Sequence, residues 1–94
     1  MKQEFTERLL RVERMERCLD AVTEAVVLRG RAALEDTAIR EQAEMLEEYR
    51  DSGLWLQDYE ADERGELPAG LKRGVLSEDA LYNLLCDLYP PEAD

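Results

Sequence analysis

Carboxylates are the side chains most able to do chemistry in this sequence, because the chain has no histidine and only two cysteines. Without histidine there is no imidazole general base, no Ser-His or Cys-His nucleophilic pair and no histidine ligand for zinc. The carboxylates are densest in one acidic cluster, defined here as Asp58, Glu60, Asp62, Glu63 and Glu66. Oxygen ligands of this kind suit magnesium or calcium, so the cluster is where a divalent ion would be sought first.

The acidic cluster does not match a calcium-binding loop. A loop of the EF-hand type that began at Asp58 would need glycine at its sixth position and glutamate at its twelfth, where this sequence has Glu63 and Ala69. A looser magnesium or calcium contact stays open beside the commoner interpretation, a solvated acidic loop. Ser52 and Ser77 are expected to cap helices, and there is no phosphate-binding glycine loop. We therefore predict no enzyme activity, no catalytic residue and no cofactor.

The net charge of −11 is unevenly distributed along the chain. Basic and acidic groups balance over residues 1–40, so the whole acidic excess lies in residues 41–94. Affinity for nucleic acid comes largely from Lys and Arg, so direct binding to nucleic acid is not expected. A basic protein partner, or solubility alone, would account for the excess.

A chain of 94 residues can build one modest core, so we predict a single domain over residues 1–94. The longest apolar run, residues 25–28, is far too short to cross a membrane, and the first residues carry no apolar secretory region. The expected location is therefore the cytoplasm, with no membrane partner. In that reducing compartment Cys18 and Cys86 are expected to be free thiols.

The N-terminal region has the apolar pattern of a long helix. Its stripe consists of Phe5, Val12, Leu19, Val26 and Ala33 at intervals of seven, with Leu9, Met15 and Val22 between them. Arg8 and Arg29 fall at stripe positions equivalent to Met15 and Val22, which argues against a coiled coil. Three i,i+4 pairs are predicted on the solvated face: Glu4 with Arg8, Glu7 with Arg11, and Glu13 with Arg17.

Small side chains widen the stripe from Cys18 onward and predict close approach of a second helix. Asp36 or Thr37 can cap that helix, which would run to about Asp51 and bury Ile39, Ala43, Leu46 and Tyr49. One continuous helix through Gly30 is the alternative, but a small protein gains more core by folding back. We predict a helical hairpin over residues 1–51. The stripe could also be completed by another copy of the chain, so the oligomeric state is open.

Residues 52–94 are predicted to close the open side of the hairpin. Ser52 is expected to cap a short helix that carries Leu54, Trp55, Leu56 and Tyr59. A polar, glycine-containing loop follows, and then Ser77 is expected to cap a terminal helix with Glu78 and Asp79 in its first turn. That helix would bury Leu81, Leu84, Leu85 and Leu88 and end before Pro90 and Pro91. The predicted fold is all-α.

The C-terminal half also carries a family resemblance. Its residues are Tyr49, Ser52, Trp55, the run DYEADE (58–63), Gly65, Leu67-Pro68 and the run LKRGVLSEDALYNLL (71–85). In these the chain resembles small bacterial helical proteins known as domain of unknown function 4298, although Asp51 stands where the family favours glycine, and Gly53 and Leu54 stand where it favours acids. The resemblance implies an all-helical bacterial cytoplasmic protein and an ordered segment 58–74 in which DYEADE and LKRG face each other. It implies no activity.

The functional hypothesis is a non-catalytic protein-interaction or regulatory module with an unidentified protein partner. The predicted partner-binding residues are Trp55, Tyr59, Lys72, Arg73 and Tyr82. Lys72 and Arg73 would otherwise pair with the acidic cluster across the turn. An acidic mimic that occupies a nucleic-acid-binding protein is the alternative, and a divalent-metal site at the acidic cluster is the third hypothesis.

Overall fold

The chain folds into helices joined by short turns. A computed structural model describes residues 2–77 and 79–89, in which all regular structure is helical. The elements are α1 (Lys2–Arg29), the 3-10 helix η1 (Gly30–Glu35), α2 (Thr37–Asp51), α3 (Leu54–Glu63), the 3-10 helix η2 (Gly74–Leu76) and α4 (Ala80–Leu88). The predicted all-α fold is confirmed.

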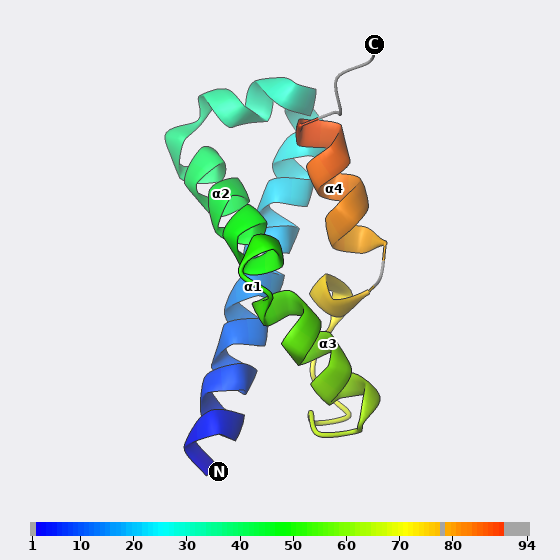
Figure 1. Cartoon of the computed structure of the whole chain (residues 1–94). Helices are drawn as coiled ribbons and strands as arrows, with labels where there is room; N and C mark the ends of the chain where they lie inside the picture. Colours follow the sequence, from blue (N-terminus) through cyan, green and yellow to red (C-terminus); the bar gives the residue numbers. More distant parts are fainter. Residues whose placement is uncertain (1, 78, 90–94) are drawn as a thin grey trace.

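The first two helices form the predicted hairpin (Figure 1). Helix α1 ends at Arg29 because Gly30 takes a φ of 60°, a left-handed conformation that other residues rarely adopt. After η1 the chain enters α2 at Asp36, whose carboxylate accepts hydrogen bonds from the amides of Ala38 at 2.9 Å and Ile39 at 3.4 Å. Asp36 is therefore the cap, and α1 and α2 are separate helices rather than one continuous helix.

The interface between α1 and α2 holds the centre of the core. Val12 and Val22 of the apolar stripe and Leu46 of α2 are completely buried, as predicted. Three other stripe positions differ from the prediction, since Phe5 is exposed and Leu9 and Val26 are only half-buried. Phe5 is exposed because it lies toward the N-terminal end of α1, and α2 crosses the middle of that helix (Figure 1).

Helix α3, the polar loop, η2 and α4 close the other side of the hairpin. Helix α4 lies near the hairpin turn, and α3 extends toward the end where α1 begins (Figure 1). Apolar side chains from this half complete the core: Leu67, Val75, Leu76, Leu81, Leu84, Leu85 and Leu88. The four leucines predicted for the terminal helix are therefore all buried.

Two predicted helix caps are wrong. Ser52 ends α2, and Gly53, with a φ of 89°, is the N-cap of α3, although the Ser52 hydroxyl still accepts from the Leu54 amide at 3.3 Å. Ser77 ends η2 by donating its amide to the Gly74 carbonyl at 3.0 Å, and α4 begins later, at Ala80. Each serine instead completes the preceding turn, Ser52 by donating its amide to the Glu48 carbonyl at 2.8 Å. Glu78, Pro90 and Pro91 lie outside the described residues.

The backbone of Val75 in η2 is held from two helices. Its amide donates to Oε1 of Glu16 on α1 at 2.8 Å, and its carbonyl accepts from Nε1 of Trp55 on α3 at 2.8 Å. Glu16 is buried, and a Cβ on Gly74 would lie 3.1 Å from its Oε2 atom, so only glycine leaves this carboxylate undisturbed. These contacts fix the polar loop to the hairpin.

Replacing Glu16 with alanine is expected to lower the free energy of unfolding by about 1–3 kcal/mol, because the buried amide of Val75 loses its acceptor. Urea unfolding followed by circular dichroism measures the loss. Glu24→Ala, at an exposed position on the same helix, is the matched control and should change stability by less than about 0.5 kcal/mol. Equal losses in the two variants would show that the contact to Val75 does not stabilise the fold.

Candidate functional site

Asp58 is the most buried charged group in the described chain, with an exposed fraction of 0%. Its Oδ1 atom accepts from Nε of Arg8 at 3.0 Å and from Nη2 of Arg11 at 2.6 Å. Its Oδ2 atom accepts from Nε of Arg11 at 2.8 Å and from the Tyr49 hydroxyl at 2.7 Å. These four residues, named here the Asp58 cluster, join α1, α2 and α3.

The contacts of Arg8 and Arg11 differ from the predicted i,i+4 pairs and explain why an arginine lies in the apolar stripe. Arg8 and Arg11 were predicted to pair with Glu4 and Glu7 on a solvated face, but both guanidinium groups donate to Asp58. A neighbouring cation stabilises a carboxylate that is buried away from water more strongly than it stabilises an exposed glutamate. Arg8 therefore occupies a position in the apolar stripe because its partner is inside the protein.

Burial and hydrogen bonding act in opposite directions on Asp58. Burial raises the pKa of its carboxyl group, but the hydrogen bonds from Arg11 and Tyr49 and the charge of Arg11 outweigh it, so the pKa lies below its ordinary value. For Tyr49, burial and then the hydrogen bond to Asp58 raise the pKa far above its ordinary value. The cluster is thus a carboxylate that accepts from a protonated phenol and two guanidinium groups.

Asp58 has no capacity left to bind a metal ion or a substrate. Its two oxygens together offer about four acceptor sites, and four donor contacts occupy them. Across residues 2–77 and 79–89, no group of three or more Cys, Asp or Glu side chains is arranged to hold a metal ion. The contacts of Asp58, the buried carboxylate of the acidic cluster, are therefore structural.

The lowered pKa of Asp58 predicts how stability depends on pH. Because the folded pKa lies below the unfolded value of 3.8, the ionised group stabilises the fold above that pH, and the contribution is lost as pH falls through the folded pKa. Urea unfolding between about pH 7 and pH 3 should therefore show a smaller loss of stability for Asp58→Asn than for the wild type. Glu60→Gln, which neutralises an exposed carboxylate on the same helix, is the control and should follow the wild type closely. Parallel curves for wild type and Asp58→Asn would contradict this assignment.

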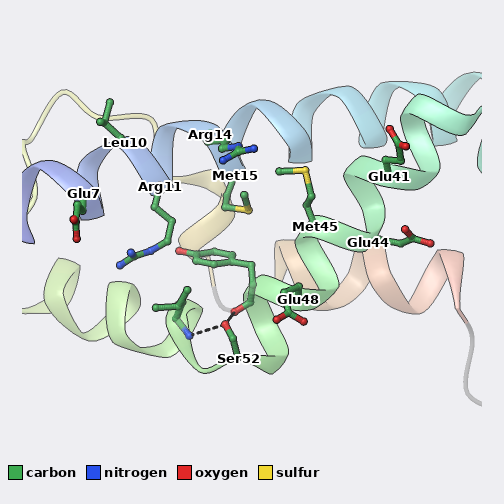
Figure 2. Close-up of a pocket in the computed structure, with 12 residues that line it drawn as sticks. Glu7, Leu10, Arg11, Arg14, Met15, Glu41, Glu44, Met45, Glu48 and Ser52 are labelled. Carbon is green, nitrogen blue, oxygen red and sulfur yellow. Dashed lines mark hydrogen bonds between the residues drawn. The ribbon is translucent and has the colours of Figure 1, made fainter.

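An open groove of about 680 Å³ lies beside the Asp58 cluster, between α1 and α2 (Figure 2). Leu10 and Met15 of α1, Met45 and Tyr49 of α2, and Leu54 of α3 give it an apolar lining. Figure 2 shows the thioether side chains of Met15 and Met45 pointing toward each other across the groove. Tyr49 and Arg11 belong to both the groove and the Asp58 cluster, so the cluster fixes part of the groove wall.

The rim of this α1/α2 groove is mainly acidic. On α2, the exposed residues Glu41, Glu44 and Glu48 follow one another at spacings that place them on one helix face. On α1, the rim carries one acidic and one basic side chain, Glu7 and Arg14. The groove is therefore an apolar trough with a negative edge along α2.

The aromatic residues predicted to bind a partner lie elsewhere. The rings of Trp55 and Tyr59 are stacked, with centroids 5.1 Å apart, and the Trp55 indole also binds the Val75 carbonyl. Tyr82, 62% exposed, lines with Trp55 a small hollow of about 220 Å³. The structure thus brings Trp55 close to both other aromatic residues. Their role in binding a partner stays a prediction.

The predicted basic residues make contacts within the chain. Arg73 pairs with Asp62 and also donates to the Pro68 carbonyl, which confirms that LKRG faces DYEADE. The Nζ atom of Lys72 lies 3.5 Å from Oδ2 of Asp20 on α1. The prediction that Lys72 pairs with the acidic cluster is therefore wrong. The loop runs against α1 at this point and presents Lys72 to that helix. Both residues remain predicted partner contacts.

Neither the groove nor the donors to Asp58 were predicted from the sequence. Leu10, exposed by 58%, adjoins the apolar stripe without belonging to it, and Met45 lies beside the predicted core positions of α2. These two positions were the available signal for the groove. The signal for the Asp58 cluster was the arginine at a stripe position.

The fold and the site together define a small all-α protein. Its helical hairpin is joined to α3 by the Asp58 cluster and carries an open apolar groove. The chain belongs to the family described as domain of unknown function DUF4298, whose model matches residues 12–90. Tyr49 and Asp58 lie inside the matched range, and Arg8 and Arg11 lie just before it. No curated protein and no solved structure shows a match to the chain. None of the helices in the described residues is both long and apolar enough to cross a membrane.

Proposed function

We propose that this protein is a non-catalytic docking module that binds an amphipathic helix of a protein partner in the α1/α2 groove. The observation that carries the proposal is the apolar lining of an open groove between two antiparallel helices. Grooves of this kind take the apolar face of a helix through residues one turn apart. Leu10 is 58% exposed although it is large and apolar, and a docked helix would cover it.

Two features support a groove that is ready to bind. The Asp58 cluster holds Tyr49 and Arg11 in place, so part of the wall is fixed before a partner arrives. Met15 and Met45 supply flexible, polarizable side chains that can adjust to the shape of a ligand. A second copy of the chain is a poorer occupant, because each copy carries a net charge of −11 and association would bring like charges together.

The test is affinity capture, in which the folded wild type and its matched surface variants are compared for the partner proteins that they retain. Leu10→Glu places a charge in the groove, and Leu56→Glu places the same charge at an apolar position on α3 that is also exposed, by 52%. We expect Leu10→Glu to lose the partner that the wild type and Leu56→Glu retain. Retention of one set of proteins by all three forms would refute docking in the groove. Tyr82→Glu, included in parallel, tests the surface predicted from sequence.

The acidic mimic remains a second candidate, and the net charge of −11 is the observation that favours it. A mimic of nucleic acid would bind basic proteins through its overall charge, so its complexes should weaken steeply with salt. Leu10→Glu adds negative charge, so it should not weaken binding of this kind. Capture that is strong at low salt, absent at high salt and unchanged in Leu10→Glu would favour the mimic over the docking module.

A further inference from the structure

Resting on the proposed function, we infer that the groove selects a basic amphipathic helix, with a row of Lys or Arg along the edge that faces Glu41, Glu44 and Glu48. These three carboxylates line the α2 edge of the groove at positions i, i+3 and i+7. They span about 10 Å along the helix axis, or two turns. A partner helix lying along α2 can match that length with cations of the same spacing.

The carboxylates of this edge are not neutralised within the protein. All three are exposed, and among the residues that the structure describes none of them forms an ion pair. Of the two arginines that line the groove, Arg11 and Arg14, Arg11 is held by Asp58. Arg50, at the end of α2, pairs with Asp51. The α2 edge therefore presents a negative charge that a ligand can meet.

The two edges of the groove differ, and the difference sets how a partner helix is rotated about its own axis. The α1 edge combines Glu7 with Arg14, so its charges offset each other. The α2 edge carries three carboxylates. A helix with cations along one border of its apolar face would place that border against α2 and its neutral border against α1. Charge thus supplies orientation, while the apolar lining supplies contact area.

The experiment uses three synthetic peptides of about 18 residues, a length that supports several helical turns. All share one apolar face of Leu, Met and Ala, and they differ at three edge positions, which carry Lys, Gln or Glu. Fluorescence anisotropy measures the binding of each to the wild type, to the triple variant Glu41→Lys, Glu44→Lys, Glu48→Lys, and to Leu10→Glu. Circular dichroism confirms that the variants fold.

The inference predicts that the wild type binds the Lys peptide about tenfold more tightly than the Gln peptide and binds the Glu peptide weakest. The triple variant should invert this order. Leu10→Glu should bind both the Lys and the Gln peptide more weakly than the wild type does, because both peptides use the same apolar lining.

Several outcomes would overturn the inference. If the wild type binds the three peptides equally and Leu10→Glu binds none of them, selection by charge is refuted. Docking in the groove is not contradicted by that result. No binding of any peptide would also refute the inference, while the capture experiment with Leu10→Glu and Leu56→Glu decides the proposed function separately. Binding of the Lys peptide that Leu10→Glu does not weaken would show attraction by net charge alone. Sedimentation that shows the wild type as a dimer dissociated by Leu10→Glu would make a second copy the occupant.

Discussion

Asp58→Ala is expected to lower the free energy of unfolding by about 3–5 kcal/mol, the largest effect of any polar substitution considered for this chain. The change removes the acceptor of four hydrogen bonds and leaves the guanidinium groups of Arg8 and Arg11 partly buried without their counter-ion. A small domain has only about 5–15 kcal/mol of stability in total, so the loss is a large fraction of it. Urea unfolding followed by circular dichroism measures the change.

The control for Asp58→Ala is Glu60→Ala, which removes an exposed carboxylate from the same helix and should change stability by less than about 0.5 kcal/mol. A similar small change for both variants would mean that the Asp58 cluster does not hold α3 against the hairpin. The expected loss of unfolding free energy is the effect of removing one partner and leaving the others in place. It does not measure what the intact ion pairs contribute relative to an apolar replacement of all the partners.

Leu46→Ala is expected to cost about 2–5 kcal/mol, because Leu46 is completely buried and α2 packs on α1 through it. For a domain of this size each lost kcal/mol lowers the melting temperature by about 4–8 °C, so thermal unfolding reports the effect directly.

Leu56→Ala is the matched control for Leu46→Ala, since it removes the same atoms from an apolar side chain that is 52% exposed on α3. It should shift the melting temperature by only a small part of the shift in Leu46→Ala. Comparable shifts would contradict a core centred on the interface between α1 and α2.

The fold could be predicted from the sequence because its main elements leave local signals. The heptad spacing of Val12 and Leu19 marks the buried face of α1, and Asp36 marks the start of α2. The serine caps failed because a serine can end one turn as readily as it begins the next. At Ser52 and Ser77 the outcome depends on the backbone that follows, including the left-handed Gly53.

The candidate site could be predicted only in part, because its contacts join residues far apart in the sequence. The run DYEADE shows carboxylates but does not show that Asp58 points inward while Glu60 is exposed. That choice depends on the rotation of α3 against α1, from which Arg8 and Arg11 reach Asp58. The groove depends on the side of the hairpin that α3, η2 and α4 leave uncovered.

Residues 58–74 comprise the second half of α3, the polar loop and the first residue of η2, and they are held in place by their own contacts. Asp58 binds Arg8 and Arg11 of α1, and Arg73 closes the loop on Asp62. At the end of the segment Gly74 leads into Val75, whose backbone is bound by Glu16 and Trp55. These contacts account for an ordered segment.

Docking in the α1/α2 groove is tested most directly by mapping the Lys-edged peptide onto the protein with backbone amide NMR. During titration of the wild-type protein, the account predicts that chemical shift changes concentrate at Leu10, Met15, Met45 and Leu54 and at the neighbouring Glu41, Glu44 and Glu48. The same changes should be absent in Leu10→Glu. Changes centred on Trp55, Lys72 and Tyr82, with the groove residues unaffected, would contradict docking in the groove and favour the surface predicted from sequence.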